Sequence, residues 1–327
     1  MSEYNSNLLR AIIGLKVAET DIRKLRENEV LVKTEAAPCN PSDIAFIRGG
    51  YNVRKNPPAV PGFEGTGIVV DTGIRVAKFY GKRVSAFVRQ DDSGTWSEYF
   101  ITGARDCILV KEGMETDQAA CLAINPFTAW ALVEIALMKK SPVIIQNASG
   151  GQVAAFIRIL AMQNGIEVID IVRKKEHIES LRNSGSKNII DMSGENFKSE
   201  LHQLAHQFDA HLAFDAVGGG MTGILLNALP GFSEVVLYGG LAGGGISGID
   251  PADIIFRNKK LSGFNLSDWK KQKCQVDFDE ISGTIQDMMI SHGLKTLIQG
   301  TYPLTEATEA LKSYIKSMSA GKILFKP

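Results

Sequence analysis

Two short stretches near the amino terminus carry residue types that can bind a metal ion. Residues 37–51 read APCNPSDIAFIRGGY, which places Cys39 near Asp43. Residues 61–65 read PGFEG, with Glu64 in a glycine-rich turn. Because zinc is held by several thiolate, imidazole or carboxylate ligands together, the residues around Cys39 and Glu64 decide whether this is a metal site.

A second candidate site lies where an apolar stretch runs into Asn147-Ala148-Ser149-Gly150-Gly151 and a helical pattern begins. Small residues let the backbone approach a pyrophosphate, and the first N–H groups of the helix and its dipole stabilise the negative charge. Ala154 takes the third small position of the dinucleotide fingerprint. The strict GxGxxG pattern is absent, but the strand-turn-helix context favours dinucleotide binding over a plain tight turn.

The choice of dinucleotide depends on the next predicted strand. Asp170 follows the glycines by about 20 residues, as the ribose-binding acid of NADH enzymes does. Asp170 falls inside the strand, however, whereas Arg173 and Lys174 stand at its carboxyl end. Such cations pair with a 2′-phosphate, although they can also be the solvated start of the next helix. The pattern favours NADPH over NADH.

A histidine pair offers a third candidate. His202 and His206 are spaced as in the HExxH zinc motif, but the position of the catalytic glutamate is Gln203. His211 is near in sequence only. Surface histidines on an ordinary amphipathic helix are the favoured interpretation.

The elements that must position these residues change in character along the chain. The first part is predicted to be strand-rich, with β-branched or aromatic runs between turn residues, and a helical pattern follows it. The predicted strands cover 27–37, 65–70, 82–88 and 97–102, and the helical pattern covers 117–136.

Apolar strands then alternate with amphipathic helices, which predicts a parallel sheet covered on both faces, a doubly wound nucleotide-binding fold. A helix is predicted over 279–293, and the segment 301–327, a turn, a helix and a last strand, is expected to return to the first domain. The alternating strands are predicted at 141–147, 167–172, 187–191, 210–217, 234–240 and 259–266, and the helices at 151–165, 174–185, 195–208 and 220–229.

Composition limits the partners. A chain of 327 residues predicts two domains. Lys plus Arg and Asp plus Glu both count 36, so no basic field attracts nucleic acid or an anionic membrane. The four cysteines form no CxxC pair, no secretory signal is evident, and no apolar run reaches the ~20 residues of a membrane span. The cytosol is the expected compartment.

With these residues in hand, the chain resembles the medium-chain dehydrogenase/reductase superfamily, in its zinc-free quinone-oxidoreductase and enoyl-reductase-like branch. The resemblance covers nearly the whole chain, and the order and spacing of its motifs are more specific than any single one. The matching segments are NPSD at 40–43, PGFEGTG at 61–67, GTWSEY at 94–99, NPFTAW at 125–130, NASGG at 147–151, DAVGG at 215–219, LYGGLAG at 237–243 and GKILFKP at 321–327.

The resemblance implies an α/β protein with two domains. A mainly β, GroES-like catalytic domain is expected to take 1–117 and 267–327, and a Rossmann NADP(H)-binding domain is expected to take 118–266. It also implies a homodimer formed through the edge of the nucleotide-domain sheet.

The resemblance answers the question of the metal site. Zinc-dependent relatives carry Cys-His-Ser/Thr-Asp and Gly-His-Glu in the first two segments. Aligned on Asp43, this chain has Asn40 and Pro41 in place of the cysteine and histidine, and Phe63 in place of the second histidine. Of the ligand types, only Glu64 remains in place. Cys39 lies one residue before the position of the zinc-binding cysteine, so no metal site is expected.

Without a metal to activate a simple ketone, conjugated acceptors become the expected substrates, because hydride can add to the β-carbon while charge spreads to an oxygen. A proton donor is then required. Tyr51 occupies the position where enoyl-reductase relatives have a tyrosine implicated as proton donor or substrate anchor, and a phenol with a pKa near ~10 can donate. A structural tyrosine is the alternative.

The resemblance also implies the remaining site residues. Asn40 and Thr128 are expected beside the nicotinamide, and Trp269 is expected to line the substrate pocket. The other coenzyme contacts implied are Gly150, Gly151, Val153, Tyr238, Gly239, Gly240, Leu241, Phe264, Asn265 and Leu266, and they join Arg173 and Lys174, which are singled out by their place after the predicted strand.

These residues favour a metal-independent, NADPH-dependent reductase of quinones, enones or 2-enoyl thioesters. Two alternatives stay open. One is an NADP(H)-binding redox sensor without turnover, because Gln152 and Ala154 depart from the small residues common in this branch. The other is a zinc-independent protein of the alcohol dehydrogenase type.

Overall fold

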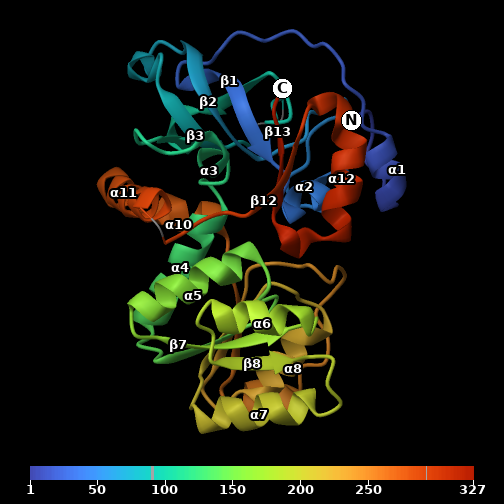
Figure 1. Cartoon of the computed structure of the whole chain (residues 1–327), viewed down its shortest axis with the longest axis vertical. Coiled ribbons are helices and arrows are strands. Elements are labelled where there is room, and N and C mark those ends of the chain that lie inside the picture. The colour runs from blue at the N-terminus through green and yellow to red at the C-terminus, as the bar shows by residue number, and fades with distance from the viewer. Residues whose placement is uncertain (90–91, 292) are drawn as a thin grey trace. The chain divides into compact units, whose positions relative to one another are not determined.

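The structure, a computed structural model, describes residues 1–89, 92–291 and 293–327. The chain forms two compact units: unit 1 comprises Met1–Phe127 and Asp279–Pro327, and unit 2 comprises Thr128–Phe278 (Figure 1). The unit boundaries lie within two helices, whereas the sequence placed its domain boundaries after residues 117 and 266. The division into a catalytic and a coenzyme-binding domain at these boundaries stays a prediction. The two helices are α4 (Asn125–Met138) and α11 (Gln275–Ser291).

Unit 1 is built on a mixed sheet with the strand order β12-β13-β1-β2-β3-β5, in which β4 also pairs with β1. The four strands predicted for the first part of the chain are confirmed, because buried apolar residues such as Val30 and Val32 alternate with more exposed ones. The strands are β1 (Glu29–Pro38), β2 (Glu64–Thr72), β3 (Arg83–Phe87), β4 (Tyr99–Gly103), β5 (Cys107–Leu109), β12 (Ile298–Tyr302) and β13 (Lys322–Phe325).

The carboxyl-terminal segment returns to unit 1, as expected. Strand β13 pairs antiparallel with the end of β1, where Ala37 lies opposite Phe325. Helix α12 (Ala307–Lys316) packs against β13 and buries Leu311 and Tyr314 in the same core. The last strand therefore lies next to the segment that follows β1.

Short helices complete unit 1. Helix α2 buries Ile44, Phe46 and Ile47 in the core shared with α12. The predicted helix 279–293 corresponds to α11 from Asp279 to Ser291, and its residue His292 lies outside the described residues. The other elements are α1 (Leu8–Ile13), α2 (Pro41–Ile47), η1 (Ala77–Phe79), η2 (Ala104–Asp106), α3 (Thr116–Ala120), η3 (Leu304–Glu306) and η4 (Met318–Ala320).

The helical pattern at 117–136 proves to be two helices, α3 and α4, with a break between them. Pro126 is the second residue of α4 and has no N–H to continue a helix from the preceding turn. The break leaves the N–H of Ile124 outside both helices, where it donates to the carboxylate of Glu64.

Unit 2 contains a parallel sheet with the order β11-β10-β9-β6-β7-β8, which confirms the predicted doubly wound pattern. Its first strand, β6, lies between β9 and β7, so the chain winds outward in both directions from this strand. In such sheets, ligands bind beyond the carboxyl ends of the strands where the order reverses. The strands are β6 (Val143–Gln146), β7 (Glu167–Val172), β8 (Asn188–Asp191), β9 (Leu212–Asp215), β10 (Glu234–Leu237) and β11 (Lys260–Gly263).

Helices α7 and α8 cover one face of this sheet. Their apolar residues Leu201 and Leu225 pack in one core with Ile145 and Ile171 of the strands. No helix of the described residues is long and apolar enough to cross a bilayer. Besides α4, the helices are α5 (Gln152–Gln163), α6 (Glu176–Asn183), α7 (Phe197–Gln207), α8 (Gly220–Ala228), α9 (Pro251–Ile255) and α10 (Leu266–Gln272).

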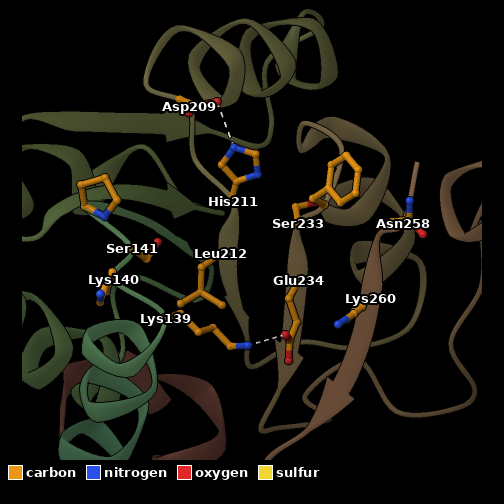
Figure 2. A pocket seen from close by; sticks show the side chains of 12 residues that line it. Lys139, Lys140, Ser141, Asp209, His211, Leu212, Ser233, Glu234, Asn258 and Lys260 are labelled. Atoms are coloured by element: carbon orange, nitrogen blue, oxygen red, sulfur yellow. Dashed lines mark hydrogen bonds and ion pairs between the residues drawn. The ribbon is translucent and has the colours of Figure 1, made fainter. Parts of the chain in front are cut away.

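A cavity of about 600 Å³ opens at the amino ends of β6, β9, β10 and β11 (Figure 2). Lys139 pairs with Glu234 across it at 2.7 Å, and His211 contacts Asp209 at 3.0 Å. Since the glycine turn follows the carboxyl end of β6, this cavity lies at the opposite edge of the sheet from the predicted coenzyme site.

Candidate active site

Three adjacent strands of unit 1 bring polar side chains together where they begin or end. Asn40 follows the end of β1, Glu64 begins β2, and Lys322 begins β13. Strand β1 lies between the other two and runs antiparallel to both, so its end meets their beginnings. This topology gathers residues that are distant in sequence.

The three side chains form a buried hydrogen-bonded chain. The Lys322 ammonium donates to Asn40 Oδ1, and Asn40 Nδ2 donates to Glu64 Oε2 at 3.0 Å. The second carboxylate oxygen of Glu64 accepts the Ile124 N–H at 2.8 Å. All three side chains are buried, Lys322 with only 3% of its surface exposed. Burial raises the pKa of Glu64, and the Lys322 charge opposes that rise.

Asp43 is a second carboxylate in this interior. It accepts the backbone N–H of Asn40 at 2.7 Å and that of Phe63 at 3.0 Å, and it is fully buried in the first turn of α2. Burial raises its pKa to about 7, although both N–H groups and Lys322 favour the ionised form. Asp43 therefore ties the start of α2 to the turn before Glu64.

Tyr51 lies in the same unit, in the loop after α2. Its half-buried ring packs against that of Phe63, with the centroids 5.1 Å apart. Burial raises the pKa of the Tyr51 phenol, the charge of Asp43 raises it further, and Arg89 acts in the opposite direction. The phenol therefore keeps its proton throughout the neutral range, as a proton donor must.

The two stretches that carry metal-binding residue types do not form a donor set. Cys39 is fully buried among apolar side chains, and Phe63 packs between the rings of Phe46 and Tyr51. Both polar atoms of the Asn40 amide are occupied by Lys322 and Glu64. An ammonium group in direct contact with Asn40 is itself incompatible with a bound cation. Within the described residues, no group of three or more His, Cys, Asp or Glu side chains can hold a metal ion. That result covers His202, His206 and His211.

In unit 2, the glycine turn joins β6 to α5 as predicted. Ala148 adopts a positive φ of 50°, and Gly151 caps the helix in an extended conformation. A Cβ on Gly150 would lie 3.2 Å from the ring of His177, and one on Gly151 would lie 3.1 Å from Ala148 O. Both glycines are therefore closely packed on the side where a Cβ would project, and this turn of small residues at the start of α5 fits a pyrophosphate.

A buried polar network fixes this turn to the loop after β9. Asn147 Nδ2 donates to Asp215 Oδ1 at 2.6 Å, and Asn147 Oδ1 accepts the N–H of Ala216 at 2.8 Å. Asp215 also accepts Thr222 Oγ1 at 2.6 Å and the backbone N–H of Val217 at 2.8 Å. The carboxyl ends of β6 and β9 are thus locked together where the strand order reverses.

The structure at the end of β7 distinguishes the two candidate partners of the ribose, Asp170 and the Arg173–Lys174 pair. Asp170 is fully buried inside the strand and bonded to Gln146 at 2.7 Å, to Arg158 at 2.8 Å and to Ser186. Arg173 and Lys174 follow the strand and are exposed, and Lys174 contacts Glu176 at 2.9 Å. Asp170 is unable to reach a ribose, whereas the two cations are accessible.

The segment after β10 returns to the same edge of the sheet. The N–H of Tyr238 donates to the backbone oxygen of Asp215 at 2.9 Å, and that of Leu241 to Ala216 O at 3.2 Å. A Cβ on Gly239 would lie 2.5 Å from the same Ala216 oxygen, so this close approach requires glycine. The N–H of Phe264, after β11, donates to Leu237 O at 2.8 Å. The predicted coenzyme residues of these two segments therefore stand together in unit 2.

Trp269 is held by other residues of unit 2. Its Nε1 donates to Glu134 Oε2 at 2.7 Å, and the Lys273 ammonium lies 5.2 Å from its ring. The side chain is buried, as is Thr128 near the start of α4. Asn265 accepts the N–H groups of Ser267 and Asp268 at the start of α10. The roles of Trp269 and Thr128 stay predictions.

Three functional candidates were missed in the sequence. Lys322 gave no signal, because a lysine at the start of a terminal strand is ordinarily exposed. His177 is four residues after Arg173, and only the structure shows that its ring lies 3.2 Å from the position that a Cβ on Gly150 would take. Asp215 lies in the segment DAVGG, but its carboxylate network depends on residues from β6 and α8.

Two sequence profiles match the chain. One describes the alcohol dehydrogenase GroES-like domain and covers residues 26–112, and the other describes zinc-binding dehydrogenases and covers residues 153–282. The name of the second includes zinc, but the described residues around Asn40 and Glu64 do not form a set of zinc ligands.

Known proteins are similar over most of the chain. A mitochondrial enoyl-[acyl-carrier-protein] reductase of Xenopus tropicalis is 33% identical over 282 residues, which are 84% of this chain and 79% of that protein. A provisionally assigned NADPH:quinone reductase of Mesorhizobium loti has a TM-score of 0.87 and 27% identity, covering 92% of this chain and 88% of that one. Another from Bacillus thuringiensis has a TM-score of 0.86 and 25% identity, covering 100% and 97%.

Proposed function

The chain belongs to the medium-chain dehydrogenase/reductase superfamily, in its quinone-oxidoreductase and enoyl-reductase branch, and on this premise we propose that it is an NADPH-dependent, metal-independent reductase of conjugated carbonyl compounds. Quinones, enones and 2-enoyl thioesters are the candidate acceptors. The observation that carries the proposal is the buried centre of unit 1, where an amide and an ammonium take the place of metal ligands and Tyr51 retains a proton.

Unit 2 supplies the coenzyme residues. The glycine turn at Gly150 and Gly151, at the start of α5, suits the pyrophosphate, and the exposed Arg173 and Lys174 suit the 2′-phosphate. The segments after β10 and β11 provide further backbone at the same sheet edge. When bound, NADPH supplies the hydride.

Unit 1 supplies the proton. When hydride adds to the β-carbon of the acceptor, the C=C electron pair moves toward the α-carbon and carbonyl oxygen, and one proton is needed to complete the saturated product. The Tyr51 phenol, or a water molecule next to it, delivers that proton in this proposal. A conjugated acceptor spreads the developing charge, so the reaction does not depend on a Lewis acid.

The test is NADPH oxidation, followed by absorbance with a chelator present, against quinones, enones, 2-enoyl thioesters and simple ketones. We expect turnover with at least one conjugated class and none with simple ketones. Turnover that the chelator abolishes, or turnover with ketones alone, would contradict the proposal. Tight NADPH binding without any turnover would instead support a redox sensor.

We also propose a homodimer and a cytosolic location. The dimer is supported by the edge strand β11 and by exposed apolar residues before it, at Ile254, Ile255 and Phe256. The cytosol is supported by free cysteines without a disulfide framework. The Xenopus relative is named as mitochondrial, so fractionation of cells that express the chain is the direct test of location.

A further inference from the structure

We propose that Lys322 is a positioning residue that serves as the built-in cation of the unit 1 centre, orienting the Asn40 amide and offsetting the charge of Glu64. The inference deepens the proposed function, because Asn40 is a predicted coenzyme neighbour. Its first test measures stability and is independent of catalysis.

The argument begins with donor and acceptor types. An ammonium group only donates hydrogen bonds and a carboxylate only accepts them. Lys322 therefore selects the oxygen of the Asn40 amide, and Glu64 selects its nitrogen. With both ends occupied, the amide has one orientation, and that orientation is set by residues from two other strands.

Charge balance gives the second step. Asp43 and Glu64 are both fully buried, and a buried carboxylate without a compensating cation is costly. Burial raises the pKa of each carboxyl group, and Lys322 acts against that rise at both. The Lys322 ammonium is itself 3% exposed, so solvent does not screen it.

Lys55 is a second buried lysine of unit 1 and has contacts of a different kind. Lys55 donates to the carbonyl oxygens of Val60 and Ser93, and lies 5.3 Å from the Phe63 ring centroid. The charge of Lys322, by contrast, acts against the raised pKa of both Asp43 and Glu64. Lys322 is thus a cation that these two carboxylates share.

The first test is a double-mutant cycle on thermal stability. Lys322→Met removes the cation, Glu64→Gln removes the charge it offsets, and the double variant removes both. Since breaking a buried pair leaves an uncompensated charge, we expect Lys322→Met to lower the melting temperature by about 5–15 °C. Adding Glu64→Gln should restore at least half of that loss.

Lys259 provides a matched control, because it is also 3% exposed and pairs with Asp253 at 2.9 Å in unit 2. The effects of Lys259→Met and Glu64→Gln on the melting temperature should be additive. Additive effects of Lys322→Met and Glu64→Gln would overturn the proposal. If Lys322→Met fails to fold, the proposal requires that the double variant still folds, and its failure to do so would equally overturn it.

The second test separates positioning from structure in the folded double variant, where the Asn40 amide has lost its charged partners. We expect kcat to fall about 10–100-fold while the Kd for NADPH stays within about threefold. Unchanged kcat would refute the positioning role and leave only charge compensation. If the wild-type protein reduces no acceptor, the proposed function fails, whereas the stability cycle still decides the role of Lys322.

Discussion

At the scale of single residues, Tyr51 is the proposed proton donor. Its ring packs on Phe63. Burial raises the pKa of its phenol, and the charge of Asp43 contributes a smaller rise. Tyr51→Phe removes the proton but keeps the ring packing. We expect kcat with a conjugated acceptor to fall by about 10²–10⁴-fold, with the Kd for NADPH unchanged.

Tyr80→Phe is the control for this substitution, because Tyr80 is in the same unit and 67% exposed. It should leave kcat unchanged. If Tyr51→Phe retained full turnover, the proton would have to come from another group or from water alone.

Arg173 is the residue proposed to select NADPH over NADH. It is exposed beyond the end of β7, whereas Asp170 is buried and bonded within the fold. A charge-assisted hydrogen bond contributes about 1.5–3 kcal/mol, so Arg173→Ala should weaken NADPH binding about 10–100-fold. The Kd for NADH, measured by fluorescence titration, should stay the same.

Lys187→Ala removes an exposed positive charge elsewhere in unit 2 and controls for the net charge of the unit. This substitution should leave the Kd for NADPH and the Kd for NADH nearly unchanged. Equal losses of NADPH and NADH affinity in Arg173→Ala would rule out the 2′-phosphate assignment.

Asp43 predicts a pH dependence of stability. Its pKa is raised to about 7 by burial, so between about pH 4 and 7 the folded protein holds a proton that the unfolded chain releases. Stability from this group is therefore greatest at low pH and falls as pH rises through that window. As pH rises from about 4 to 7, the unfolding free energy of the wild-type protein should fall by up to about 4 kcal/mol relative to that of Asp43→Asn.

Urea unfolding of both proteins at several pH values measures this difference. Asp268→Asn, at an exposed carboxylate, should not reproduce the slope. Glu64 has a pKa raised in the same direction and is present in both proteins, so its contribution cancels to first order. A wild-type protein that gains stability over Asp43→Asn as pH rises would contradict the assignment.

At the scale of elements, the loops after the strands of unit 2 determine the shape of the predicted coenzyme site. Two adjacent glycines after β10 differ sharply: a Cβ on Gly239 would lie 2.5 Å from Ala216 O, and one on Gly240 would meet nothing within 4 Å. Gly239→Ala should therefore destabilise the protein by about 1–3 kcal/mol, and Gly240→Ala by at most about 0.5 kcal/mol. Urea unfolding compares them directly.

Gly240→Ala is the matched control, since the two variants add the same methyl group one position apart. Equal stabilities would mean that the loop after β10 moves away from Ala216 without cost.

The elements themselves could largely be predicted from the sequence, because apolar runs and amphipathic helices are local signals. The parallel sheet of unit 2 and the strands of unit 1 are confirmed. The break between α3 and α4 was not predicted, because the apolar spacing continues across it and only Pro126 marks the change. The short helix α9 was also missed.

The candidate site was less predictable, because its side chains meet through pairings between distant strands. Asn40 and Glu64 could be singled out from motifs, but Lys322 joins them only because β13 pairs with β1. Similarly, Asp170 could be placed inside its strand from the sequence, whereas its bonds to Arg158 and Ser186 come from other elements. The contacts of a buried polar group are non-local, and local patterns do not report them.

At the scale of the whole molecule, the edge of the unit 2 sheet predicts self-association. Strand β11 pairs only with β10 in the described sheet, and Phe256 before it is 79% exposed. An open edge beside exposed apolar residues favours pairing with a second copy. Phe256→Asp should convert a dimer to a monomer in light scattering.

Met162→Asp is the control, because Met162 is 67% exposed on α5, away from this edge in sequence. It should leave the mass in solution unchanged. A wild-type protein that is monomeric at micromolar concentration would contradict the proposed dimer.

The central claim is that hydride reaches a conjugated carbon without a metal. The most direct measurement uses NADPH deuterated at the transferred position, a 2-enoyl thioester and a chelated enzyme, with NMR analysis of the product. We predict one deuterium at the β-carbon and one solvent-derived proton at the α-carbon. Deuterium at the carbonyl carbon, or no transfer until zinc is added, would contradict the account.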